Sequence, residues 1–370
     1  MSSSPSHRLT GLHRYALFLA LAAFILITSG GIVTSHNAGM AVPDWPNSFG
    51  YNMFLLPVSK WFSELGIIQE HTHRLIASYV GMFTIAFLVY IYWKDGRGWM
   101  RMLGVLALAA VIIQGVLGGL RVLNVNTDFG VVHGCLAQAF FTLICLMALF
   151  TSPWWVNTSV EQARRGAPVP AYVPRFLVVL TAAIFLQLTL GATMRHAHIG
   201  KAHLGLAVPD FPLAYGQLWP DTSPAALEKI NAPRDNEPEA IFPITKSLIH
   251  IHMTHRIMAV LLVLGTGTYC VIMLSQPCLP GVLRRSALIW VTLVFLQFCL
   301  GAATIWTGKA ADVATMHVAV GTLLMMSGAV QAAMAYRLMY LRNAVLPSGN
   351  PKDGTAKTAG SAIAERALVA

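Results

Sequence analysis

The sequence predicts an all-α polytopic membrane protein, with eight transmembrane helices arranged as two parallel four-helix-bundle repeats. Three observations carry this prediction: an apolar composition, eight long apolar runs, and a set of motifs that occurs twice. Hydrophobic residues make up 56% of the 370 residues and charged residues 11%, whereas soluble domains carry about 25% charged residues. The mean hydropathy of +0.61 agrees with a chain that lies mostly in lipid.

Windows of roughly 20 apolar residues mark the spans. Residues 1–14 precede the first span, and this segment is too short and polar to be a cleavable signal peptide. A linker at 151–174 joins the two halves, and the polar tail at 341–370 is expected to be flexible. The halves are 15–150 and 175–340, and the second contains the large loop 196–247. The predicted spans are 15–35, 70–92, 101–121, 130–150, 175–195, 248–274, 286–306 and 314–336.

The charges predict the orientation of these spans. With both termini on one side, that side holds fifteen Lys and Arg against four Asp and Glu, and the other side seven against eleven. The positive-inside rule then places both termini and the linker in the cytoplasm. The net charge of +10 is explained by topology and by membrane lipid, so no nucleic-acid partner is expected. The default location is the bacterial cytoplasmic (inner) membrane.

Repeated motifs indicate that the second half of the chain is a repeat of the first. AVPDWP at 41–46 recurs as AVPDFP at 207–212, and THRLIA at 72–77 recurs as THRIMA at 254–259. The segments around Gln114 and His133 match those around Gln297 and His317, so the three later matches have offsets of 182, 183 and 184 residues. Because each half has an even number of spans, the repeats run in the same direction across the membrane.

Four histidines occupy repeat-related positions near the outer ends of alternate spans: His73, His133, His255 and His317. Imidazoles inside a bilayer are costly and tend to mark function. A pair on two facing helices suits a heme iron held between them, and nearby glycines would leave room for a flat macrocycle. The alternative for any single histidine is a hydrogen bond between helices.

The repeats differ beside one of these histidines. Glu70 lies three residues before His73 and shares its helical face, whereas His252 takes that place before His255. A carboxylate at this position can accept a proton or offset positive charge. The first half is therefore expected to be reactive and the second to transfer electrons. The alternative is an acid that stabilises a helix N-terminus.

The residues around these ligands have simpler interpretations. Arg74 and Arg256 follow the ligands and could pair with heme propionates or extend to lipid headgroups. His71 lies about 200° around the helix from His73 and is expected at the outer face. The repeated PDWP and PDFP segments are expected to be structural, with a turn that begins at the aspartate and loops that could cover the pockets.

The outer segment RHAHIGKAH contains three further histidines, His196, His198 and His203. Their spacing matches no closed copper or zinc site, and their role stays open.

Eight spans in two repeats, a Glu-x-x-His-Arg motif (Glu70, His73, Arg74) and single histidines on three later spans (His133, His255, His317) resemble the heme A synthase family. The resemblance covers about residues 15–340. It implies oxidation of the methyl group at porphyrin position 8 of heme O to a formyl by successive hydroxylations, which gives heme A for terminal oxidases. It also implies that His255 and His317 hold a heme b cofactor, that His73 and His133 flank the substrate heme, and that Glu70 is catalytic.

The same resemblance suggests partners: heme O as substrate, heme O synthase, oxidase assembly factors and an unknown redox partner. Some bacterial members have a cysteine pair in the first outer loop, but residues 36–69 contain no cysteine, so a mechanism that uses such a pair is closed here. Two other classes remain as alternatives. One is a two-heme membrane cytochrome b for quinol-linked electron transfer, and the other is a transporter built from parallel repeats.

Overall fold

A computed structural model of the protein describes residues 5–124, 128–164, 167–196, 206–233 and 243–343. These residues form helices joined by loops, with two isolated β-bridges and no strand in the described part of the chain. In chain order the helices are α1 (Pro5–Ser35), η1 (Met53–Leu55), α2 (Val58–Trp61), α3 (Leu65–Lys94), α4 (Gly98–Asn124), α5 (Asp128–Thr151), α6 (Pro153–Asn157), α7 (Val160–Arg164), α8 (Tyr172–His196), α9 (Pro224–Asn231), α10 (Lys246–Ser275), α11 (Gly281–Trp306) and α12 (Ala311–Asn343).

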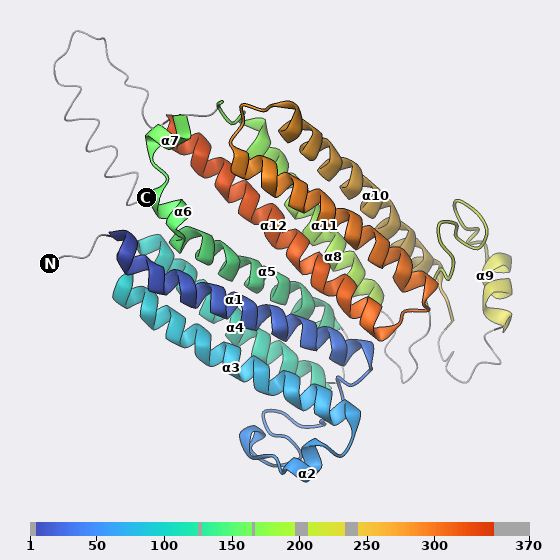
Figure 1. Ribbon diagram of the computed structural model, residues 1–370. Helices are drawn as coiled ribbons and strands as arrows, with labels where there is room; N and C mark the ends of the chain where they lie inside the picture. Colours follow the sequence, from blue (N-terminus) through green and yellow to red (C-terminus); the bar gives the residue numbers. More distant parts are fainter. Residues whose placement is uncertain (1–4, 125–127, 165–166, 197–205, 234–242, 344–370) are drawn as a thin grey trace, which may run out of the picture.

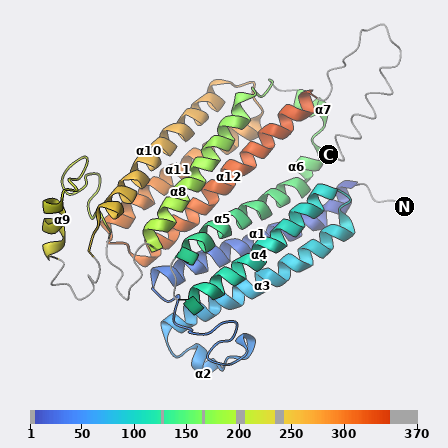
Figure 2. The same ribbon diagram turned by 180° about the vertical axis from the view of Figure 1, so that it is seen from behind.

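Eight of the described helices are long and apolar enough to cross a membrane, as the sequence predicts. They form two groups that lie side by side, α1 with α3–α5 and α8 with α10–α12 (Figures 1 and 2). The groups meet where α1 packs against α12 and where α5 packs against α8 and α12. The loops that carry α2 and α9 lie at one end of the bundle, which we call the site end (Figure 1).

The helices extend beyond the predicted spans. The first begins at Pro5, where a span from residue 15 was expected, and α3 begins at Leu65, where residue 70 was expected. Apolar residues Leu65, Ile67 and Ile68 continue the helical pattern outside the predicted span. Glu70 therefore lies in the second turn of α3, outside its first turn. The interpretation of Glu70 as an acid at a helix N-terminus loses its geometric basis.

The dense cores of both groups lie toward the end opposite the loops. In the first group, side chains such as Leu19, Phe87 and Ile144 are fully buried. In the second group Trp290 is fully buried and donates a hydrogen bond from Nε1 to the carbonyl of Leu324, at 2.9 Å. Close packing at this end gives the helices a rigid base, so the side chains at the site end can border an open space.

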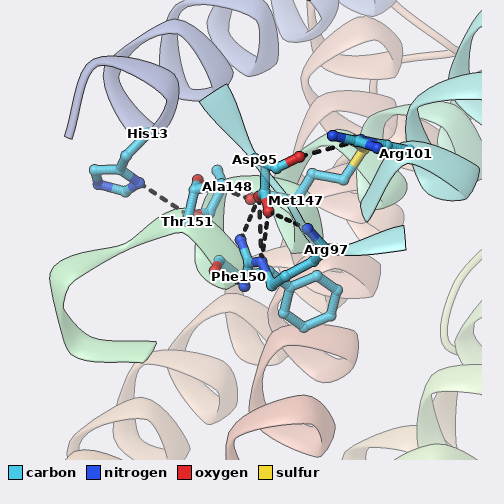
Figure 3. A network of polar contacts seen from close by, with 8 residues as sticks. All are labelled: His13, Asp95, Arg97, Arg101, Met147, Ala148, Phe150 and Thr151. Carbon is cyan, nitrogen blue, oxygen red and sulfur yellow. Dashed lines mark hydrogen bonds and ion pairs between the residues drawn. The ribbon is translucent and has the colours of Figure 1, made fainter. Parts of the chain in front are cut away.

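A polar network ties three helices together at the end opposite the site (Figure 3). Arg97, at the start of α4, forms an ion pair with Asp95 at 2.6 Å and donates to the carbonyl of Phe150 on α5, at 3.0 Å. His13 Nδ1 on α1 lies 2.8 Å from the carbonyl of Ala148 on α5. These bonds fix the base of the first group without taking part in the site.

Candidate functional site

One cavity of about 950 Å³ occupies the site end and extends across both helix groups. All four repeat-related histidines border it: His73 on α3, His133 on α5, His255 on α10 and His317 on α12. His73 and His133 are close enough to interact electrostatically, and so are His255 and His317. The histidines that the sequence singles out thus line one cavity as two pairs.

Each of these imidazole rings packs against a glycine on a neighbouring helix. A Cβ atom placed on Gly30 of α1 would lie 3.0 Å from Cε1 of His73. The corresponding distances are 3.4 Å for Gly118 and His133, 3.2 Å for Gly191 and His255, and 3.2 Å for Gly301 and His317. A larger residue at Gly30, Gly191 or Gly301 would have to displace the ring, whereas a Cβ at Gly118 would be in ordinary contact with it. The glycines therefore fix where each ring lies.

The nitrogen atoms of the four rings have distinct surroundings. In each ring Nδ1 is buried and has no hydrogen-bond partner among the described residues. A backbone carbonyl faces each ring, from Leu26, Gln114, Gln187 and Gln297 respectively, although the Nδ1 geometry falls short of a hydrogen bond. Histidines that bind metals usually donate their other ring N–H to a carbonyl. Donation of Nδ1–H to these carbonyls would leave Nε2 for a metal; in His317 this Nε2 lies 3.4 Å from Nε2 of the Gln297 side chain.

The position three residues before the α3 and α10 histidines differs between the two groups. Glu70 is buried, with 3% of its surface exposed, and borders the cavity. Its Oε1 lies 2.6 Å from Nη2 of Arg74, and its Oε2 accepts a hydrogen bond from the backbone N–H of Val42, at 2.8 Å. His252, also buried, takes this position in the second group. The carboxylate is thus held rigidly on one side of the cavity only.

Arg74 and Arg256 bind the two loops that contain the repeated AVPD motifs. The guanidinium of Arg74 donates to the carbonyls of Val42, Asp44 and Asn47, at 2.6–3.2 Å. Arg256 donates in the same way to the carbonyls of Val208, Asp210 and Leu213, at 2.7–3.2 Å. These bonds use Nη1 and Nη2 of both arginines, so these nitrogen atoms are already bonded to the loops. Their pairing with propionates remains a prediction.

The aspartate of each AVPD motif begins a turn, in agreement with the sequence. Asp44 accepts hydrogen bonds from the N–H groups of Phe49 and Gly50, at 2.6 and 2.7 Å. Burial would raise the pKa of Asp44, but these two bonds and the nearby Arg74 outweigh it, and the pKa lies below its ordinary value. Asp210 has the equivalent bonds and a lowered pKa. Both turns hold an aromatic–proline pair against the cavity: Trp45 and Pro46, and Phe211 and Pro212.

His71 does not border the cavity. It was expected at the outer face, but it is buried under the first loop, with 1% of its surface exposed. Its Nδ1 lies 3.2 Å from Oγ of Ser48, and its ring lies edge-on to Trp61, at 5.1 Å. The α2 segment covers this end of α3, which the sequence pattern alone did not indicate.

Three cations at the junction of the two groups were not singled out from the sequence: Arg121 on α4, Arg195 on α8, and Lys309 between α11 and α12. Arg195 interacts electrostatically with both of the others. It donates to the carbonyl of Gly31 and to Oγ of Ser35 on α1, at 2.8 and 2.6 Å. Burial, and then Arg195, lower the pKa of Lys309. We call these three residues the cationic cluster.

No described acidic residue forms an ion pair with the cationic cluster. Nε of Arg121 and Nε of Arg195 are buried and have no hydrogen-bond partner in the described ranges. Glu70 and the hydrogen bonds of Arg195 offset part of the cost of burying these cations, and a bound anion would stabilise them further. Comparison of the repeats could have singled out Arg121 and Arg195, because the matching positions in the other repeat are Thr304 and Thr34.

Of the three histidines in the second outer segment, the structure describes only His196. It is buried with 7% of its surface exposed, borders the cavity, and packs against Gly130 of α5. His198 and His203 lie outside the described residues. His196 belongs to the junction, where it interacts electrostatically first with Arg121 and then with Arg195.

The residues present fit two heme groups. Paired imidazoles on facing helices suit axial ligation of iron, and one cavity borders all four rings. The cationic cluster offers partners for the carboxylates that every heme carries. The cavity is at the upper end of the volume range for small-molecule pockets.

Comparison with known proteins finds one family model, described as cytochrome oxidase assembly protein, that matches residues 13–328. A heme A synthase of Sphingopyxis alaskensis is 26% identical over 369 residues, which covers 91% of this chain and 94% of that protein. A heme A synthase of Rhizorhabdus wittichii is 24% identical over 87% of this chain and 93% of its own length. A third, from Alkalihalophilus pseudofirmus, is 24% identical over 88% of this chain and 96% of its own length.

Proposed function

Because the chain belongs to the cytochrome oxidase assembly protein family, we propose that it is a heme A synthase. It oxidises the C8 methyl group of heme O to a formyl by successive hydroxylations, and so supplies heme A to terminal oxidases. The observation that carries this proposal is the single cavity in which two histidine pairs are nearly equivalent but only one has a buried carboxylate beside it. Two equal electron-transfer sites would need no such difference.

In this proposal the first helix group holds the substrate. His73 and His133 flank heme O, and their glycine neighbours Gly30 and Gly118 set the orientation of the rings. In the second group, His255 and His317 would hold heme b, with their rings positioned by Gly191 and Gly301. A bound heme b would supply an iron that changes oxidation state and carries electrons to or from the first group.

Glu70 is the proposed catalytic residue. Its Oε2 is held by the backbone of Val42 and its Oε1 by Arg74, so the carboxylate does not need to reorganise when charge changes at the substrate. In that place it can accept a proton from the reacting group or stabilise positive charge that develops on the macrocycle. Its counterpart His252 offers no fixed negative charge.

The loops and the cationic cluster complete the site. The two AVPD turns hold Trp45 and Phe211 over the cavity, where they exclude water from the macrocycles. Arg121, Arg195 and Lys309 provide the positive charge that propionates require. Arg74 and Arg256 anchor the loops and stand near enough to the histidines to remain further candidates for this role.

The wider setting follows from the proposal. The protein lies in the bacterial inner membrane with both termini in the cytoplasm, receives heme O from heme O synthase, and delivers heme A to oxidase assembly factors. Conversion of the methyl group to a formyl is an oxidation that inserts one oxygen atom. The redox partner accepts electrons if water supplies that oxygen, and donates electrons if molecular oxygen supplies it.

Expression in a host that makes heme O but lacks a heme A synthase tests the proposed function. Hemes are extracted from purified protein and membranes, separated by chromatography and identified by mass. The proposal predicts heme A in cells that express the protein and none in cells that carry an empty vector. Purified protein with bound heme b but without any oxidised heme O would favour the two-heme cytochrome b.

A further inference from the structure

The two halves of the cavity differ most in size at two positions that the sequence repeat makes equivalent. The match of Gln114 with Gln297 pairs Gly115 of α4 with Phe298 of α11. The match of His133 with His317 likewise pairs Gly134 of α5 with Val318 of α12. All four of these residues border the cavity. The first half is therefore wider than the second on one side.

The space beside the two glycines is open. A Cβ atom placed on Gly115 or Gly134 would meet no atom within 4 Å. By contrast, a Cβ on Gly104 or Gly265, deeper in the bundle, would lie 2.8 Å from Leu88 or 2.6 Å from Leu180, respectively. Close helix packing explains glycine at such deep positions, but it does not explain Gly115 and Gly134.

The opening at Gly115 leads to the lipid-facing surface of α4. Gly115 is itself exposed, and its neighbours Ile112 and Val116 are 58% and 44% exposed. The same compartment contains two buried polar atoms that have no partner among the described residues, Nδ1 of His133 and Oε1 of Gln114. These atoms point to a ligand in the compartment, and the opening points to a part of that ligand that extends into lipid.

In the second half an aromatic cluster fills the equivalent space. Phe298 lies edge-on to Phe211 of the second loop, with ring centroids 5.9 Å apart. Phe211 also packs edge-on against Trp306, and Nε1 of Trp306 donates to its carbonyl at 3.2 Å. Phe298 thus packs against Phe211, which Trp306 in turn holds in place, so Phe298 cannot easily move aside.

We propose that the opening at Gly115 and Gly134 admits the isoprenoid side chain of the substrate heme, and that Phe298 excludes this chain from the second half. The inference rests on the proposed function. Heme O carries a long apolar chain where heme b carries a vinyl group, while both have iron and propionates. Histidines that bind iron and cations that bind propionates would bind heme O and heme b equally well. A gap that opens into lipid would favour heme O, because only heme O has the long chain. Burial of the chain in lipid and against α4 favours heme O there.

Heme uptake by the purified, intact protein tests this assignment. Wild type and the Gly115→Phe variant, each with heme b in the second half, are offered heme O or additional heme b in detergent. Bound hemes are extracted and counted per polypeptide. The variant should lower uptake of heme O relative to heme b by about tenfold or more, because the ring blocks the chain but spares the macrocycle.

Three further variants control for the size of the substitution. Ile113→Phe places the same ring on another exposed face of α4, outside the cavity, and should leave the uptake ratio unchanged. Gly134→Val narrows the gap from α5 and should lower the ratio in the same direction. Phe298→Gly opens the second half and should raise the amount of heme O bound per polypeptide, a gain that misfolding cannot produce.

The outcomes separate this inference from the function on which it rests. An unchanged heme O to heme b ratio in Gly115→Phe, or an equal loss of both hemes from its first half, would overturn the assignment of the opening. Wild-type protein that takes up no heme O would instead overturn the proposed function. The spectrum of heme b in the second half shows in each variant that the bundle has folded.

Discussion

At the scale of single residues, the two proposed heme b ligands of the second helix group can be tested separately. His255→Ala or His317→Ala should remove most of the bound heme b, because one axial bond to iron is lost. His36→Ala is the control, since His36 is an exposed histidine just after α1 whose ring contacts only the carbonyl of Ile32 in the last turn of that helix. Absorbance of the heme Soret band per polypeptide measures the effect. Full heme content in both ligand variants would contradict the assignment.

The cationic cluster makes a second prediction at this scale. Arg195→Gln removes a charge that the described acidic residues do not balance, so it should weaken retention of the hemes. It should also lower the reduction potential of heme b, because positive charge nearby favours the reduced iron. Potentiometric titration measures this shift. Arg284→Gln, at the opposite end of the bundle, should leave the potential unchanged; an equal shift in both variants would exclude a local role.

At the scale of helices and loops, glycine decides where each imidazole lies. Gly301→Leu on α11 should displace His317 and reduce heme b content by about tenfold, since a Cβ alone already comes within 3.2 Å of the ring. Gly81→Leu on α3 is the matched control, because a Cβ there would meet no atom within 4 Å. Equal heme contents in the two variants would show that the glycine contact is incidental.

The first loop has a predictable dependence on pH. The pKa of Asp44 is lowered, so its bonds stabilise the loop above the ordinary value of about 3.9 and are lost as pH falls through the lower folded value. The exchange rate of the backbone N–H groups of residues 41–51, relative to the intrinsic rate at each pH, should therefore rise only below about pH 4. In Asp44→Asn it should be raised already at neutral pH, while the second loop, with Asp210 intact, serves as internal control. Unchanged exchange at neutral pH would contradict this role.

At the scale of the whole molecule, apolar composition was enough to predict eight spans, and the described helices contain each of them. Their ends were harder to predict. The helices α1 and α3 begin 10 and 5 residues before the predicted spans, because a helix can continue beyond the apolar window that the pattern detects. The two-repeat arrangement stays a prediction, supported by the matching glycine contacts of the four histidines.

The site residues were predictable where the two repeats carry the same histidine, and where one repeat carries a carboxylate and the other does not. The four histidines and Glu70 border one cavity, and the sequence had singled out each of them. The place of the cationic cluster at the junction of the two groups and the burial of His71 could not be predicted from the repeats. They depend on how the two groups and the α2 segment pack together, and no periodic pattern records contacts between distant segments. Equivalent positions in the two repeats distinguish Glu70 from His252, and they also distinguish Arg121 from Thr304 and Arg195 from Thr34.

The central claim is that one buried carboxylate makes the first half the reactive half. Glu70→Gln and Glu64→Gln are therefore expressed in a host that makes heme O without its own heme A synthase, and extracted hemes are identified by mass. Glu64 is an exposed residue at the start of α3 and is the matched control.

The account predicts that Glu64→Gln makes heme A as the wild type does. It predicts that Glu70→Gln retains heme b but makes about a hundredfold less heme A and stalls at heme O or a hydroxylated intermediate. Wild-type amounts of heme A from Glu70→Gln would contradict it.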